Sequence, residues 1–332
     1  TFVPVKKQTM TKDKWYGHMA ILATNFIFGL NTPIAKTIVP EWISPYALTL
    51  VRMSFAALIF WCAGSFSARE HVTPRDLVII FFGALFGLVG AQLSFAHALL
   101  YTSPVNISII AAMTPVAVML LAAIVLKEPV TLKKATGVFL GASGALLIIL
   151  HSASGNNNQE SNLIGNLLCI VNVITYAIYL VITRPVSQRY SPVTLMKWMF
   201  LFSALISIPL GIGTIPESRI FSYTASPNII LRLAYIVIMA TGVAYFLVPM
   251  ALKRIRPTTV SMYNNIQPIV ASIIAIIIGQ DVFSWDKPIA ACLVFAGVYL
   301  VTQSKSKEEM DKNHSELHDQ SLLNQVLIKP YK

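Results

Sequence analysis

Residues 104–130, PVNISIIAAMTPVAVMLLAAIVLKEPV, return 153 positions later as residues 257–283, PTTVSMYNNIQPIVASIIAIIIGQDVF. In this ungapped register, three residues that are uncommon in apolar runs recur: Pro104, Pro115 and Glu128 return as Pro257, Pro268 and Asp281. Chance pairing of aliphatic residues does not produce such matches. Each stretch is also long and apolar enough for a membrane-spanning helix. The chain is therefore predicted to contain an internal repeat of membrane-spanning segments.

The composition of the whole chain agrees with a membrane protein. Of its 332 residues, 55% are hydrophobic and 12% are charged, whereas soluble domains average about 45–50% and about 25%. Too few polar residues remain to cover a soluble globule, which excludes an ordinary soluble enzyme, a disordered chain and a disulfide-rich secreted module. Cys62, Cys169 and Cys292 each lie in an apolar run without metal-ligand spacing, so they are read as small hydrophobic residues.

Ten long apolar runs predict an all-α integral membrane protein with ten transmembrane helices. The predicted spans are 16–38, 45–65, 77–99, 104–126, 132–150, 162–183, 192–213, 229–252, 257–279 and 286–303. A shift of 148 aligns Gly17 with Gly165 and Lys36 with Arg184, which extends the repeat to the first span of each half. The halves are then 16–150 and 162–303, between tails 1–15 and 304–332. Five is an odd number, so the second half enters the membrane from the opposite side, as in transporters with inverted repeats.

Basic residues predict the orientation. With the N-terminus inside, 19 of the 25 Lys and Arg residues fall on the inner side, 4 fall outside and 2 lie within spans (19 + 4 + 2 = 25). The positive-inside rule therefore predicts two cytoplasmic termini. The same bias explains the net charge of +11, so nucleic-acid binding is not needed to account for it. The first span lacks a signal-peptide cleavage pattern and is read as retained. The chain begins with Thr1, and Met10 is an alternative natural start. Whether residues 1–9 belong to the native protein is therefore left open.

These features resemble the EamA-like family of the drug/metabolite transporter superfamily. The resemblance rests on the 5 + 5 spans, on Pro45 and Arg52 in the second span, on Pro115 and Pro268, and on the Lys127–Thr131 turn before a glycine-rich fifth span. The second copy of this turn, residues 280–284, lacks the Glu-Pro pair. Membership implies a secondary carrier, often an exporter of amino acids or other small metabolites, in a bacterial inner membrane. It also implies a central cavity lined by spans 1–4 and 6–9, with spans 5 and 10 peripheral.

Two kinds of residue inside the spans are candidates for transport. Pro33, Pro115 and Pro268 are predicted to bend their helices and to take part in gating, because proline removes a backbone hydrogen bond. Arg52 and Lys197 are the cations inside spans, where charge is costly and marks function. They favour an anionic or carboxylate-bearing substrate. No Asp or Glu lies mid-span, which argues against proton-coupled export of cationic drugs.

Polar and aromatic residues gather in the same predicted spans. Together with the two cations, the predicted substrate-binding residues are Asn31, Gln92, Thr114, Tyr176, Tyr179, Tyr245, Asn264, Asn265 and Gln267. Interhelical hydrogen bonding is the alternative role for each of them. Gly137, Gly141 and Gly144 favour close helix packing, either within the chain or at a homodimer face.

The leading hypothesis is a secondary transporter that exports small polar metabolites such as amino acids by alternating access. It needs no cofactor or metal, and its partners are a small-molecule substrate and the lipid bilayer. An organic-phosphate or nucleotide-sugar exchanger is an alternative, although two cations at different depths make a poor phosphate clamp. A membrane-embedded enzyme would need a cluster of carboxylates, histidines or metal ligands, which the sequence does not show. A non-transporting scaffold would leave the repeated prolines without a purpose.

Overall fold

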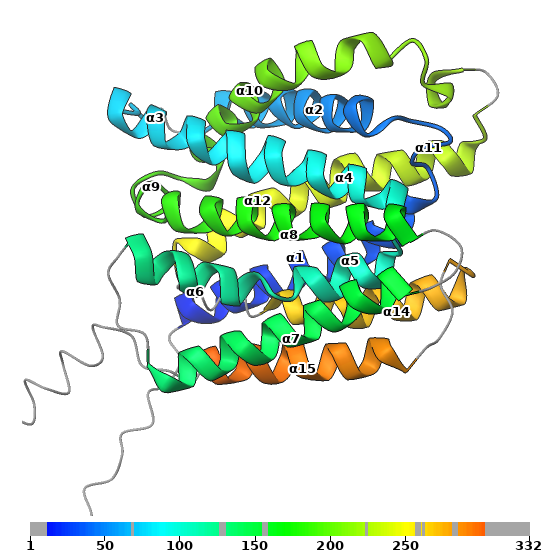
Figure 1. Cartoon of the computed structure of the whole chain (residues 1–332). Coiled ribbons are helices and arrows are strands. Elements are labelled where there is room, and N and C mark those ends of the chain that lie inside the picture. The colour runs from blue at the N-terminus through cyan, green and yellow to red at the C-terminus, as the bar shows by residue number, and fades with distance from the viewer. Residues whose placement is uncertain are drawn as a thin grey trace, which may run out of the picture.

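The computed structural model describes residues 12–67, 70–125, 131–154, 159–222, 225–255, 260, 263–280 and 285–302. Within these ranges the chain forms helices joined by short turns, and no strand (Figure 1). The Lys127–Val130 part of the predicted turn and residues 281–284 lie outside the described residues. The all-helical class predicted from the sequence is therefore confirmed for the described chain.

Two successive sets of helices make up the bundle. The first set is α1 (Lys12–Lys36), α2 (Pro45–Ser65), α3 (Pro74–Gly83), the π-helix η1 (Ala84–Gly90), α4 (Ala91–Tyr101), α5 (Pro104–Ala111), α6 (Thr114–Val125) and α7 (Leu132–Ser154). The second set is α8 (Gln159–Ile182), α9 (Arg184–Arg189), α10 (Pro192–Gly211), η2 (Ile212–Thr214), η3 (Arg219–Phe221), α11 (Pro227–Ala234), the π-helix η4 (Tyr235–Val243), α12 (Ala244–Leu252), η5 (Tyr263–Asn265), α14 (Ile266–Ile277) and α15 (Asp286–Thr302).

Local sequence explains where several of these helices begin. Ser44, Ser103 and Ser191 each accept a hydrogen bond from a backbone N–H in the first turn, and each is followed by proline at the first helical position. The serine side chain satisfies an N–H that the helix itself cannot pair, and proline has no N–H to leave unpaired. The Ser-Pro pair therefore starts a helix at equivalent positions of the two repeats, at α2 and α10.

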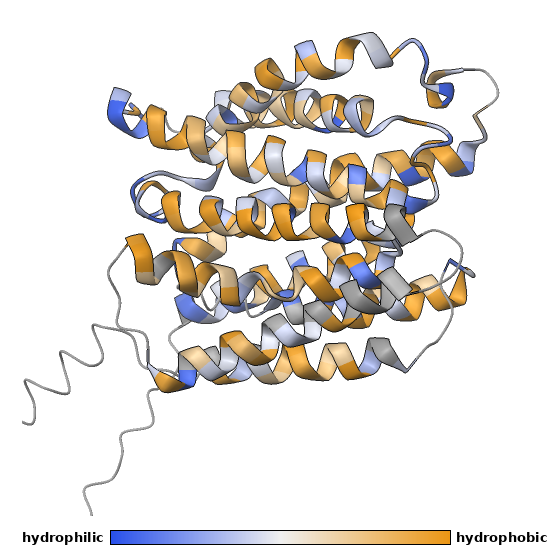
Figure 2. Ribbon diagram, viewed as in Figure 1, coloured by the Kyte–Doolittle hydropathy of each residue, from blue (hydrophilic) through white to orange (hydrophobic). Residues whose placement is uncertain are grey.

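The chain is an integral membrane protein. Six helical stretches are long and apolar enough to cross a bilayer: 45–65, 74–101, 104–125, 163–182, 192–214 and 227–252. Figure 2 shows hydrophobic residues along the helices and hydrophilic ones mainly toward their ends. The other four predicted spans correspond to α1, α7, α14 and α15, which include shorter apolar stretches at 266–277 and 288–297. The count of ten spans stays a prediction.

Equivalent helices of the two repeats run in opposite directions. We call the two ends of the bundle the α9 end and the α11 end, after the helices that lie there (Figure 1). The continuous stretch α3–η1–α4 runs from the α9 end to the α11 end, and α11–η4–α12 runs back. Each stretch contains a π-helix, and a shift of 153 places residues 84–90 onto 237–243, inside η4. The repeat is therefore inverted, and the two halves share even a local irregularity of the backbone, the π-helix.

The predicted glycine face packs inside the chain. A Cβ atom on Gly144 would lie 2.8 Å from the carbonyl oxygen of Ala290, and one on Gly297 would lie 2.5 Å from the carbonyl oxygen of Gly137. Adding 153 to position 144 gives 297, and subtracting 153 from position 290 gives 137, so the repeat exchanges the two contacts, which is the signature of a two-fold contact. α7 and α15 thus cross at the pseudo-two-fold axis. α15 covers Gly144 within the chain, and the homodimer stays a prediction that this contact does not test.

The mid-span prolines lie at breaks between helices. α5 ends at Ala111 and α6 begins at Thr114, so Pro115 stands in the first turn of α6. Pro268 likewise stands in the first turn of α14, after η5. These positions agree with the rule that proline is tolerated at a helix start and breaks a helix elsewhere, and the gating role of Pro115 and Pro268 stays a prediction. Pro33 does lie inside a helix, near the end of α1.

Candidate functional site

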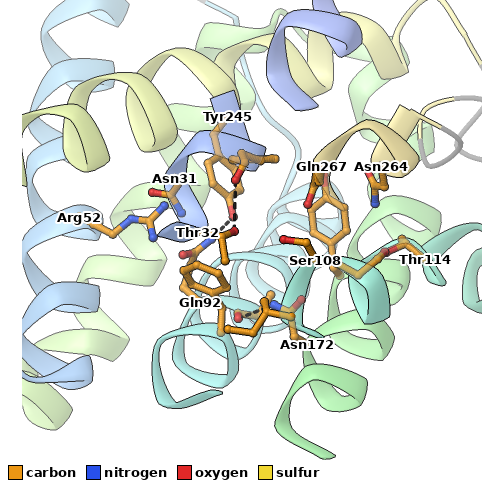
Figure 3. A pocket seen from close by; sticks show the side chains of 16 residues that line it. Asn31, Thr32, Arg52, Gln92, Ser108, Thr114, Asn172, Tyr245, Asn264 and Gln267 are labelled. Carbon is orange, nitrogen blue, oxygen red and sulfur yellow. Dashed lines mark hydrogen bonds between the residues drawn. The ribbon is translucent and has the colours of Figure 1, made fainter. Parts of the chain in front are cut away.

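A cavity of about 70 Å³ lies at the centre of the bundle (Figure 3). Water needs about 10–15 Å³ of such space, so the cavity has room for several water molecules or a chemical group of similar size. Its lining comes from α1, α2, α4, α5, α6, α8, α12, η5 and α14. The peripheral helices α7 and α15 contribute nothing to it, as the resemblance implied. The lining residues also include none from α10, although spans 6–9 had all been expected to line the cavity.

Most of the predicted site residues meet at this cavity. Those that line it are Asn31, Arg52, Gln92, Thr114, Tyr176, Tyr245, Asn264 and Gln267. Sequence reasoning missed Thr32 and Ser108, which also line it, because single hydroxyl residues in apolar helices carry no distinctive signal. Asn265 belongs to η5, and its side chain lies outside the described residues.

Two predicted residues lie elsewhere. Tyr179 is fully buried in the core beside Gly83 and Gly87, one turn from the cavity-lining Tyr176. The Lys197 ammonium lies 5.0 Å from the ring centroid of Trp61 and 5.7 Å from that of Trp198. Placing these two residues in the substrate cavity was therefore wrong. The lysine satisfies its charge through cation–π contacts, and the tyrosine fills space left by glycines.

Arg52 is the cation of the cavity. Its side chain is 2% exposed, and its Nε donates a hydrogen bond to Thr241 Oγ1 at 2.7 Å. Its Nη2 lies 3.5 Å from the carbonyl oxygen of Ala240, so the guanidinium rests on η4. A guanidinium has five N–H groups, and these contacts use two. In the described part of the chain, no Asp or Glu forms an ion pair with Arg52.

A contact on the pseudo-two-fold axis forms another wall of the cavity. Gln92 Nε2 donates a hydrogen bond to the Tyr245 hydroxyl, and the two residues are separated by 153 positions. They are thus each other's equivalents in the two repeats, and equivalent residues can touch only at the axis. The Tyr245 ring is held edge-on by Phe28 and Phe200, at centroid distances of 5.7 and 5.8 Å. The cavity therefore lies where the two halves meet, which is where inverted-repeat carriers bind substrate.

Several acceptor atoms in the cavity have no partner within the described protein. These are Asn31 Oδ1, Gln92 Oε1 and Ser108 Oγ, all buried. Leaving such a group unsatisfied costs about 1–3 kcal/mol, so water or a ligand is expected to meet them. Other lining groups are already held by the protein: Gln267 Nε2 donates to Asn25 Oδ1 at 2.6 Å, and Asn172 Nδ2 donates to the carbonyl oxygen of Ala91 at 2.7 Å.

The site thus combines a buried cation with unpaired acceptors. Figure 3 shows Arg52 and Asn31 close together at one side of the cavity, with Ser108 and Gln267 further along it. Among the described residues, no group of three His, Cys, Asp or Glu side chains gathers as a metal site would require. The arrangement can bind a polar ligand, and it contains no constellation of acid, base and nucleophile.

Comparisons with known proteins agree with this architecture. The model of the EamA-like transporter family matches residues 15–150 and again residues 163–303. The chain is 21% identical to the uncharacterized transporter YetK of Bacillus subtilis, over 92% of this chain and 93% of that one. It is 22% identical to the WAT1-related protein At1g43650 of Arabidopsis thaliana, over 94% and 98%. A solved crystal structure superposes with a TM-score of 0.63 at 19% identity and covers 89% of this chain and 99% of that one, which shows a shared fold.

Proposed function

Because the chain belongs to the EamA-like transporter family, we propose that it is a secondary transporter that exports small polar metabolites, with amino acids as the best-fitting class. The observation that carries this proposal is the position of Arg52, a buried cation that has no carboxylate partner among the described residues and lies in a cavity between two inverted repeats. A carrier of this kind binds its substrate near the midplane and exposes it to each side in turn.

The chemistry of the cavity suits a ligand with a carboxylate and an N–H donor. Arginine presents a planar fork that matches a carboxylate with two parallel hydrogen bonds. The acceptors Asn31 Oδ1 and Gln92 Oε1 suit an ammonium group, because amide oxygens only accept. An amino acid carries both groups at a fixed distance. A phosphate exchanger fits less well, because Arg52 is the sole cation among the described residues that line the cavity.

The orientation follows from the charges. The α9 end is cytoplasmic in this proposal, since most Lys and Arg residues, including Arg184, Arg189 and Arg254, belong to segments at that end. Both termini are then cytoplasmic as well, and the membrane is the bacterial inner membrane. Export is the direction that the family resemblance favours.

Transport by purified protein in liposomes tests the proposal. Vesicles are loaded with a mixture of labelled amino acids, and efflux is compared for wild type, Arg52→Met and Arg52→Lys. A lost charge-assisted hydrogen bond costs about 1.5–3 kcal/mol, so Arg52→Met is expected to raise KM about 10- to 100-fold. Arg52→Lys is expected to recover only part of this loss, because an ammonium lacks the fork.

The matched control is the other cation in a predicted span. Lys197→Gln is expected to transport nearly as wild type, because its ammonium contacts two tryptophan rings outside the cavity. Competition by unlabelled analogues then separates the two ligand groups. Equal competition by an amino acid and by the amine that lacks its carboxylate would contradict the role of Arg52, as would wild-type efflux in Arg52→Met.

A further inference from the structure

The helices around the cavity form two groups that the pseudo-two-fold axis exchanges. In the first bundle, α1 packs against η4, α12 and α14. In the second bundle, α8 packs against η1, α4, α5 and α6, and α5 also packs against α14 and α1 of the first bundle. Each bundle is tightened by close glycine contacts, and one contact in each bundle is equivalent to one in the other under the repeat. Gly17 of α1 faces Ile255, just after α12, and Gly165 of α8 faces Thr102, just after α4. These two glycine contacts stay within a bundle and hold its helices together.

At the α11 end, one side chain crosses from the first bundle to the second. Lys36, the last residue of α1, donates through Nζ to the carbonyl oxygen of Leu99 and, at 3.3 Å, to that of Thr102. Both carbonyls lie at the C-terminal end of α4, where the last turn lacks partners within the helix. A cation is favoured at this position because the carbonyls carry the negative end of the helix dipole.

At the α9 end, a second side chain crosses in the opposite sense. Arg184, the first residue of the short helix α9 that follows α8, donates through Nη1 to the carbonyl oxygen of Leu252 at 2.5 Å and to that of Ile255. These carbonyls lie at and just beyond the C-terminal end of α12, which belongs to the first bundle. The chemistry is the same as at the α11 end: a long cationic side chain donates to carbonyls at the C-terminal end of a helix in the other bundle.

The two contacts are equivalent under the repeat. The shift of 148 converts Lys36 into Arg184, and the shift of 153 converts Leu99 and Thr102 into Leu252 and Ile255. Sequence alignment pairs the two cations, but it does not show that they bind equivalent carbonyls. The structure therefore contains equivalent hydrogen-bonded contacts between the two bundles, from Lys36 at one end of the cavity and from Arg184 at the other.

We propose that Lys36 and Arg184 are paired latches, each of which holds one end of the cavity shut and releases when that end opens. The proposal rests on the alternating access of the proposed function and adds the residues that control it. Both latches are closed in this structure. Each lies at an end of the bundle, where water can replace the broken hydrogen bonds, so release is reversible. Both latches place a cationic side chain on carbonyls at a helix end, so opening either end breaks contacts of the same kind.

Accessibility of the cavity from each side tests the latches without any substrate. Cys62, Cys169 and Cys292 are replaced by alanine, and the cavity-lining Ala111 becomes the only cysteine through Ala111→Cys. Right-side-out and inside-out vesicles are treated with a charged, membrane-impermeant maleimide. The ratio of the two labelling rates reports how often the cavity is open to each end.

Opposite shifts are expected from the two latch variants. Lys36→Met should raise the ratio of labelling from the α11 end to labelling from the α9 end about tenfold, the size of one charge-assisted hydrogen bond. Arg184→Met should lower the ratio by a similar factor. The double variant should return to within about threefold of the starting ratio. Lys36→Arg, which keeps a cationic donor, should stay near the starting value.

Matched controls remove a cation at each end without crossing between the bundles. Arg219 stacks on the Trp42 ring at the α11 end, and Arg254 pairs with Asp13 at 2.9 Å and joins α12 to α1 within the first bundle. Arg219→Gln and Arg254→Gln are expected to leave the ratio unchanged. If a latch variant fails to fold, Lys36→Gln or Arg184→Gln retains one donor and should give a smaller shift in the same direction.

Several outcomes would overturn the proposal. These are shifts of the same sign from Lys36→Met and Arg184→Met, no shift in either variant, or equal shifts in the control variants. The result is separable from the proposed function. Failed amino-acid efflux combined with opposite labelling shifts would refute the substrate and leave the latches standing. Arg52-dependent efflux with unchanged labelling ratios would refute the latches alone.

Discussion

Replacing Gly297 by alanine should weaken the crossing of α7 and α15 by an amount that the backbone geometry sets. The new Cβ would lie 2.5 Å from the carbonyl oxygen of Gly137 and 2.5 Å from the backbone nitrogen of Gly141, whereas ordinary contacts begin at 3.4 Å. The two helices must therefore separate by about 0.9 Å (3.4 − 2.5), since backbone atoms cannot rotate away. Overpacking of this kind costs about 1–3 kcal/mol.

The matched control is Gly242→Ala, also inside a membrane-spanning helix. There the new Cβ would meet nothing closer than 3.8 Å. Alanine is intrinsically better than glycine in a helix by about 1 kcal/mol, and both variants receive this gain, so their difference isolates the steric cost. Unfolding free energies are measured by titrating SDS into micelle-bound protein and following tryptophan fluorescence. Gly297→Ala is expected to be about 1–3 kcal/mol less stable than Gly242→Ala.

The equivalent position in the first repeat sharpens the test. Gly144→Ala would place a Cβ 2.8 Å from the carbonyl oxygen of Ala290 but also 2.9 Å from the Val294 side chain, which can move. It should be destabilised in the same direction and by less. Equal stability of all three alanine variants would refute a close two-fold crossing of α7 and α15.

Three further predictions concern the network around the cavity and at the α9 end. Asp76→Asn should lower the unfolding free energy by about 1.5–3 kcal/mol, because the buried carboxylate accepts a charged hydrogen bond from Arg189 at 2.8 Å; denaturant titration checks this, and an unchanged midpoint contradicts it. Tyr245→Phe should lower the unfolding free energy by about 1–3 kcal/mol, because it leaves Gln92 without its acceptor. Adding Gln92→Leu in a double-mutant cycle should recover part of that loss. Strictly additive effects would mean that the two residues do not interact. Pro115→Ala should permit α5 and α6 to join and should reduce efflux while the thermal midpoint stays within a few degrees; normal efflux would exclude a gating role for the break.

Topology was the part of the fold that could be read from the chain. The Pro104–Glu128 and Pro257–Asp281 match, the long apolar runs and the Ser-Pro helix starts are local signals, and each acts on residues a few positions away. They predicted the inverted repeat and most helix boundaries. The helix breaks before Pro115 and Pro268 were missed, because hydropathy continues unchanged through them.

The candidate site could be predicted in part. Polar residues in apolar helices must face either the protein or a cavity, and eight of the predicted substrate-binding residues do line one cavity. Lys197 and Tyr179 do not, because the decision depended on tryptophan and glycine residues of other helices. The same applies to Arg52. The sequence identified it as a cation inside a span, but it did not predict that the guanidinium would contact the π-helix η4.

The sequence by itself determined that this is a two-fold repeated helical membrane protein, since hydropathy, helix starts and charge bias are short-range properties that add along the chain. Only the tertiary structure decided which residues of the two repeats contact each other. Gln92 meets Tyr245 on the axis, and Lys36 and Arg184 each bind carbonyls in the opposite bundle. Such contacts join residues more than sixty positions apart, and they depend on the rotation and depth of whole helices. Those are set by packing against all neighbours at once, so no local pattern encodes them.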